Sequence, residues 1–152
     1  MNPSTLELEA DLAAAVEYFK HDELAALLPF MHNFPMNCCE VVSALLAHAL
    51  SVKYPSATVL QVRGTNPTND QHHFWVEVNG KVIDPTAYQF EAASEPFVCD
   101  APNPLIANFP DVKKEHSDAS LESFCENFQL IDAAMQAEIL KRLQGKLGPI
   151  QP

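Results

Sequence analysis

Basic residues and long apolar runs are scarce in this sequence. Lys and Arg together account for 9 of the 152 residues, against 20 Asp and Glu, so the formal net charge is −11. Nucleic acids and anionic membranes bind proteins through Lys and Arg, so this balance argues against either as a partner. The apolar runs are too short to cross a bilayer, which takes about 20 residues. The first residues, MNPSTLELEADL, carry acids where a signal peptide has bases and an apolar segment. We expect a cytoplasmic protein, with secretion as an effector as the alternative.

Cysteine is also scarce, and its spacing is not that of a metal site. The four cysteines form no recognisable disulfide framework, so we expect free thiols in a reducing compartment. Cys38-Cys39 and His72-His73 are adjacent pairs, and no C-x-x-C or H-x-x-x-H spacing occurs. Adjacent strand residues point apart, and the H-x-E and P-C-x-x-C motifs of zinc deaminases are missing. The sequence therefore predicts no metal and no cofactor.

The length and the 47% hydrophobic content predict a single domain over residues 1–152. Apolar periodicity and β-branched alternation predict these elements. They are helices over 4–20, 22–28, 38–53 and 117–144, a strand over 57–64 and a hairpin over 72–90. We expect the segment 91–117, with its four prolines, to be a long ordered loop with a short strand at Phe97–Cys99. Gly145 is predicted to end the last helix, so the C-terminal helical segment spans about 117–145 and a frayed tail follows it.

The hairpin HHFWVEVNGKVIDPTAYQF carries two ionisable groups that its register brings together. Asn79-Gly80 favours a two-residue turn, because both central residues of a type I′ turn need positive φ. Val78 then faces Lys81, paired residue numbers sum to 159, and His73 becomes a diagonal neighbour of Asp84 on one face of the hairpin. His72 points to the opposite face. A histidine held by a carboxylate provides two of the three groups of a catalytic triad.

Two cysteines compete for the third position. Cys38 and Cys39 both lie at the start of the predicted helix 38–53, where the helix dipole and unpaired backbone N–H groups stabilise a thiolate. Helical periodicity leaves the choice between them open, because each has apolar residues on its own face one and two turns later. A Cys–His–Asp set of this kind performs acyl transfer through a thioester.

These motifs resemble the transglutaminase-like branch of the papain-like cysteine hydrolases. In that branch the histidine opens a His-Ala-Trp-Val-Glu strand and the aspartate lies in Asp-Pro-Thr; here HFWVE covers 73–77 and DPT covers 84–86. The chain resembles more closely a group of small bacterial and phage proteins with F-P-x-G-x-C and I-D-I-T-A-D-Q-F motifs. The corresponding stretches here are FPMNCC at 34–39 and IDPTAYQF at 83–90. The resemblance covers residues 34–90, within a core of about 29–90. This chain has Asn37 in place of the family's glycine, Glu40-Val41 in place of Gly-Asp, and Tyr88 in place of an acid.

The resemblance implies an α+β fold in which a central helix packs on a small antiparallel β-sheet with flanking helices. It also implies Cys39 as nucleophile, with Cys38 in reserve, His73 as base and Asp84 as the group that orients it. The fold would be the papain-like or transglutaminase-like core of these cysteine hydrolases.

Four further residues are candidates for the oxyanion hole or the cleft. Asn37 and Asn33 lie upstream of the cysteines and could donate to an oxyanion together with the Cys39 backbone N–H, but each also fits a turn. Trp75 fits either a cleft wall or core packing, and Gln89 either touches the site or caps its loop.

The sequence thus predicts a thiol-dependent acyl-transfer enzyme: a cysteine peptidase, an amidase or deamidase, or a transglutaminase-like protein. Its substrate would be a protein or peptide-like amide. A non-catalytic protein-interaction module on the same fold is the alternative, because a fold does not determine function. An effector or toxin-type domain that modifies a host protein is a third interpretation. The sequence predicts neither the particular substrate nor the oligomeric state.

Overall fold

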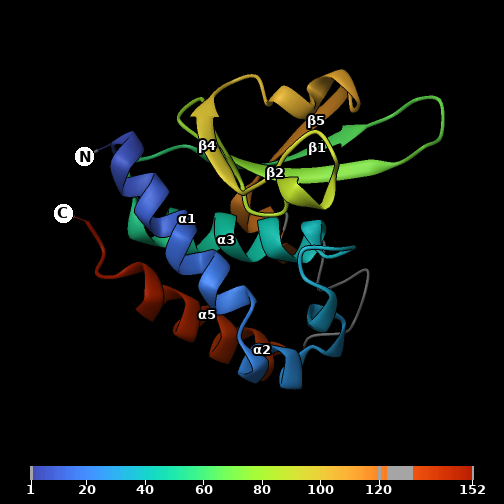
Figure 1. The fold of residues 1–152 in the computed structure, drawn as a ribbon. Helices are drawn as coiled ribbons and strands as arrows, with labels where there is room; N and C mark the ends of the chain where they lie inside the picture. The colour runs from blue at the N-terminus through green and yellow to red at the C-terminus, as the bar shows by residue number, and fades with distance from the viewer. Residues whose placement is uncertain (1, 120, 123–131, 152) are drawn as a thin grey trace.

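The computed structural model describes residues 2–119, 121–122 and 132–151 of the chain. These residues form two layers, a five-stranded antiparallel sheet and a set of helices packed against one of its faces (Figure 1). The helices are α1 (Thr5–Phe19), α2 (Asp22–Leu27), α3 (Cys39–Lys53) and α5 (Ala133–Leu147). The strands are β1 (Val59–Thr65), β2 (His72–Val78), β3 (Lys81–Asp84), β4 (Phe97–Asp100) and β5 (Asp111–His116). Short 3₁₀ turns occupy Pro29–Asn33, Ala87–Gln89 and Pro104–Ala107. The predicted α+β class is confirmed at this level.

The helical layer follows from capping and apolar periodicity. Ser4 and Glu7 form a reciprocal capping box at the start of α1, with the Ser4 N–H donating to Glu7 Oε2 at 2.7 Å. α3 is the central helix, and one of its faces is fully enclosed by the core. Its buried apolar residues include Val42, Leu45, Leu46, Ala49 and Leu50. The helices predicted over 4–20, 22–28 and 38–53 are confirmed to within one residue at each end. In the described part of the chain, no helix combines the length and apolar character needed to cross a bilayer.

The sheet has the order β4-β3-β2-β1-β5, and every neighbouring pair is antiparallel. The predicted hairpin register is confirmed, because Val78 pairs with Lys81 and Val76 with Ile83. Asn79 and Gly80 adopt φ values of 49° and 82°, as a type I′ turn requires. Val76 and Ile83 face the helices. The segment 101–110 packs on the other sheet face, where Phe109 contacts the His73 ring and lies against Gly64 of β1.

Strand β5 was not predicted; the segment 91–117 was expected to be a loop apart from the short strand that β4 confirms. β5 pairs with β1 along the edge of the sheet. Its sequence, DVKKEH, lacks the apolar alternation of a strand with one buried face, because an edge strand leaves most of its side chains in solvent. Only its pairing with β1, which is distant in sequence, reveals the strand.

The C-terminal end also differs from the prediction. Residues 120 and 123–131, within the helix expected over 117–144, lie outside the described residues. Gly145 does not end the helix: α5 continues to Leu147, and Gly148 follows it with φ of 88°. The tail is docked and not frayed, because Leu147 is buried and the Gln151 N–H donates to the Lys53 carbonyl at 2.8 Å.

A buried polar cluster that was not predicted joins three helices. Lys53 Nζ of α3 lies 2.6 Å from Asp11 Oδ1 of α1 and donates at 2.6 Å to the Leu147 carbonyl of α5. The Tyr54 hydroxyl donates to the other carboxylate oxygen of Asp11 at 2.6 Å. These contacts fix the helices at the N-terminal and C-terminal ends of the chain to the central helix.

Candidate active site

A buried histidine–carboxylate pair lies at the open end of the β2–β3 hairpin, away from its turn. His73 is the second residue of β2 and Asp84 the last of β3, and their Nε2 and Oδ2 atoms are 2.7 Å apart. Both side chains are completely buried. The predicted meeting of His73 and Asp84 is confirmed. His72 points the other way, is exposed, and is joined through Nδ1 to Thr65 Oγ1 at 2.8 Å.

Asp84 is held from two further directions. Asn103 Nδ2 donates to Asp84 Oδ2 at 2.9 Å, and the Thr86 N–H donates to Oδ1 at 3.3 Å. The Asn103 amide is itself oriented, because its Oδ1 accepts the Leu105 N–H at 2.9 Å. Sequence reasoning missed Asn103, which lies in a proline-rich segment and carries no local motif that marks it.

Aromatic rings enclose the His73 imidazole. The ring centroids of Trp75, Phe90 and Phe109 lie 5.6, 4.8 and 5.6 Å from that of His73, with Phe90 packed edge-on. A Cβ at Gly64 would come within 2.7 Å of Phe109 Cβ, so β1 needs a glycine beneath these rings. Trp75 is 1% exposed and therefore packs against His73 and does not form an open cleft wall. Phe90 and Phe109 were not predicted.

Cys39 is the cysteine that the structure brings to this histidine. It is the first residue of α3 and is half-buried, and its thiol is one of the groups that raise the pKa of the His73 ring. Asp84 occupies Nε2, and Nδ1 is buried with no hydrogen-bond partner among the described residues, so Nδ1 is the ring atom left for the thiol proton. Cys38 caps α3 and is buried in the core, and this burial, together with the neighbouring Cys39, raises the pKa of its thiol to about 12. Burial thus separates two cysteines that helical periodicity could not.

The first turn of α3 is pinned to the sheet. Ser43 Oγ donates to the Cys39 carbonyl at 2.6 Å. Gln61 of β1 donates through Nε2 to Ser43 Oγ at 2.8 Å and to the Glu40 carbonyl at 3.0 Å. The backbone of Cys39 is therefore held at a fixed height over β1.

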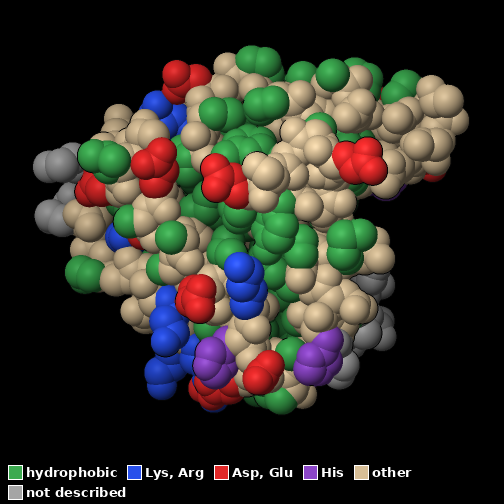
Figure 2. Space-filling view, in the orientation of Figure 1, with side chains coloured by type: hydrophobic (Ala, Val, Ile, Leu, Met, Phe, Trp, Pro, Cys, Tyr) green, Lys and Arg blue, Asp and Glu red, His purple; other side chains and the backbone are tan. Residues whose placement is uncertain are grey.

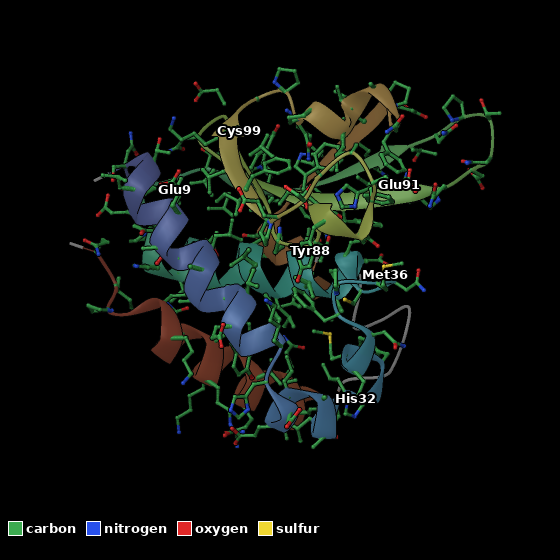
Figure 3. All side chains as sticks on the ribbon, viewed as in Figure 1. Glu9, His32, Met36, Tyr88, Glu91 and Cys99 are labelled. Carbon is green, nitrogen blue, oxygen red and sulfur yellow. The ribbon has the colours of Figure 1, made fainter. Side chains whose placement is uncertain are left out.

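The other predicted cleft residues divide into two groups. Asn37 and Gln89 meet beside the cysteines, where the Asn37 N–H donates to Gln89 Oε1 at 3.4 Å. Gln89 Nε2 is buried and unpartnered among the described residues. Asn33 is exposed, and its carbonyl accepts the Met36 N–H in a turn. Met36 precedes Asn37 and Tyr88 precedes Gln89 in the sequence. Both lie between the sheet and the helical layer (Figure 3).

The backbone of Asn37 explains one departure from the motif that residues 34–39 resemble. Its φ is 59°, in the left-handed region where glycine is the usual residue. Asn is among the few other residues that adopt this conformation readily. Asn37 therefore adopts a backbone conformation that a glycine at this position would also allow.

The environment of His73 favours its protonated form. Burial alone lowers its pKa, but the hydrogen bonds and charges of Asp84 and Cys39 outweigh burial and raise the pKa to about 9. A histidine with this pKa is an imidazolium at neutral pH.

The free energy of unfolding should therefore depend on pH through His73. The folded pKa of about 9 exceeds the unfolded value of about 6.5, so the stabilisation is complete below pH ~6.5 and is lost as the pH rises through about 9. Between pH ~6 and ~8.5 the wild type should lose about 2 kcal/mol more than His73→Gln. Urea unfolding at both pH values measures this difference. Equal losses of unfolding free energy in the wild type and His73→Gln would contradict the raised pKa of His73.

Comparison with known proteins supports the fold class and nothing finer. No family model matches the chain, and no curated protein matches it. A solved crystal structure of a genomics target aligns with 93% of this chain and 80% of its own, with a TM-score of 0.50 and 14% sequence identity. Such a likeness shows a shared fold, which belongs to the α+β class with an antiparallel sheet.

Proposed function

We propose that this chain is a thiol-dependent acyl-transfer enzyme on a papain-like or transglutaminase-like core. Cys39 is the nucleophile, His73 the general base and acid, and Asp84 the group that orients the imidazole. One observation carries the proposal: the buried His73 ring has Asp84 at Nε2, 2.7 Å away, its Nδ1 is left without a partner among the described residues, and the Cys39 thiol is near enough to raise the pKa of the ring. Peptide-like amides of proteins are the substrate class, and water or an amine is the acceptor.

The mechanism assigns one proton path to these groups. Because His73 is protonated at neutral pH, the resting site is an ion pair in which the Cys39 proton already lies on His73 Nδ1, and the thiolate attacks the substrate carbonyl carbon to form a tetrahedral oxyanion. His73 then protonates the leaving amine as the C–N bond breaks, which leaves a thioester on Cys39. Water or an acceptor amine attacks the thioester and gives its proton to His73, and the C–S bond then breaks to release the acid or new amide and the Cys39 thiolate, which restores the ion pair. Asp84 holds the Nε2–H throughout, which fixes the ring tautomer.

Two donors are candidates for the oxyanion. The Cys39 N–H lies in the first turn of α3, where backbone N–H groups have no partner within the helix. The unused Nε2 donor of Gln89 is the second candidate, because its own oxygen already binds the Asn37 N–H. Asn33 is not proposed for this role.

Alkylation of the thiols with iodoacetamide tests the proposal. At pH ~6.5 an ordinary thiol is only about 1% ionised, so a Cys39 thiolate paired with His73 should react about tenfold faster than Cys38 or Cys99, even after allowing for its weaker nucleophilicity. His73→Gln should remove this advantage. Rates are followed by peptide mapping across pH 5 to 9.

His72→Gln is the matched control, because it changes the adjacent, exposed histidine and should leave the Cys39 rate unchanged. An ordinary thiol profile at Cys39 that is indifferent to His73 would overturn the enzyme proposal. That result would favour the non-catalytic interaction module on the same fold.

A further inference from the structure

The two edges of the sheet are protected to different degrees. β4 and β5 are its edge strands. β5 reads DVKKEH, and its charged side chains disfavour pairing of this edge with a strand of another chain. β4 reads FVCD, and Phe97, Val98 and Cys99 are each left partly exposed. An apolar edge of this kind is a template for an added strand.

A groove lies between this edge and α1. It has a volume of about 510 Å³, in the range of ligand-binding pockets. Its apolar lining comes from Leu12 and Val16 of α1 and from Phe97 and Val98 of β4. Figure 2 shows hydrophobic side chains at the surface between the sheet and the helical layer, with acidic side chains among them.

The charges of the groove are all negative. Glu9 and Glu95 line it, and no Lys or Arg does. Both glutamates are exposed, and neither takes part in an ion pair of the described residues. This pattern disfavours a second copy of the chain, which carries the same net charge of −11, and also nucleic acid.

We propose that the β4 edge and this groove bind an extended segment of a partner protein in which apolar residues alternate with Lys or Arg. Strand side chains alternate between two faces, so the apolar set packs into the groove against α1. The basic side chains start from the opposite face, and their long flexible stems let the charged ends bend around the sheet edge to Glu95 and to Glu9 of α1. The backbone pairs with β4 as an added strand. The proposal is independent of the thiol chemistry of Cys39.

Peptide binding to the Cys39→Ala protein tests this proposal apart from the proposed function. The probe is a fluorescein-labelled peptide of about eight residues, alternating Val and Lys, whose binding is followed by fluorescence anisotropy. The double change Glu9→Lys and Glu95→Lys should weaken binding at least about tenfold. Asp111→Lys with Glu115→Lys on β5 is the matched control, because it makes the same change in net charge at the other edge and should alter binding less than about twofold.

Backbone pairing is tested with the same peptide N-methylated at alternate amides. Blocking the amides that face β4 should abolish binding, whereas methylation of the opposite set should not. Equal weakening by the two double variants would reduce the interaction to non-specific charge attraction and overturn the proposal. Absence of binding, or equal binding of both methylated peptides, would overturn it as well.

Discussion

Replacing Asp84 with asparagine is expected to slow acylation of Cys39 by a factor on the order of 10⁴. The carboxylate is the only charge that touches Nε2 of His73 among the described residues, and it lies 2.7 Å away with no solvent access. Asparagine keeps the shape but removes the charge, so only Cys39 is left to offset the burial of His73, and the pKa of the ring should fall well below about 9. The neutral ring no longer holds a thiolate. The burst of p-nitrophenol from p-nitrophenyl acetate measures acylation, and NMR titration of His73 measures the pKa.

Asp100→Asn is the matched control for this change. Asp100 is an exposed aspartate on β4 that pairs with Lys81 at 2.8 Å. Its replacement also removes one negative charge, but it touches neither His73 nor Cys39, so the burst rate should stay within about twofold of the wild type. A high His73 pKa that persists in Asp84→Asn would show that Asp84 does not set the protonation state of the ring.

The hairpin shows which part of the site follows from local sequence. Asn79-Gly80 fixes the turn, the turn fixes the register, and the register brings His73 to Asp84 through backbone geometry alone. No knowledge of the rest of the fold is needed for this step. The resemblance to the transglutaminase-like family pointed to the same two residues.

The rest of the site depends on contacts between distant parts of the chain. Asn103 reaches Asp84 from 19 residues away along the chain, and Phe109 packs on His73 from farther still, over a gap that only Gly64 permits. Neither side chain lies in a periodic segment, so no pattern in the sequence marks them. β5 was missed for the related reason that an exposed edge strand has no apolar alternation. Burial likewise distinguishes Cys38 from Cys39 only once the helical core is assembled.

Replacing Lys53 with methionine is expected to lower the free energy of unfolding by about 3–5 kcal/mol. Lys53 and Asp11 are joined at 2.6 Å with side-chain exposures of 9% and 5%, so the change leaves a buried carboxylate without its counter-charge. The Leu147 carbonyl of α5 also loses the hydrogen bond from Lys53 Nζ, which joins α5 to α3. Urea unfolding at neutral pH measures the difference.

Lys81→Met is the matched control for the buried pair, because it breaks an ion pair of similar length in solvent. The side chains of Lys81 and Asp100 are 31% and 86% exposed, so their loss should cost less than about 1 kcal/mol. Adding Asp11→Leu to Lys53→Met should recover much of the lost stability, since the cost lies in the unpaired buried charge and not in the missing bond. Equal losses in Lys53→Met and Lys81→Met would contradict the burial argument. A double variant no more stable than Lys53→Met alone would instead place the cost in the contact between Lys53 and the C-terminal helix.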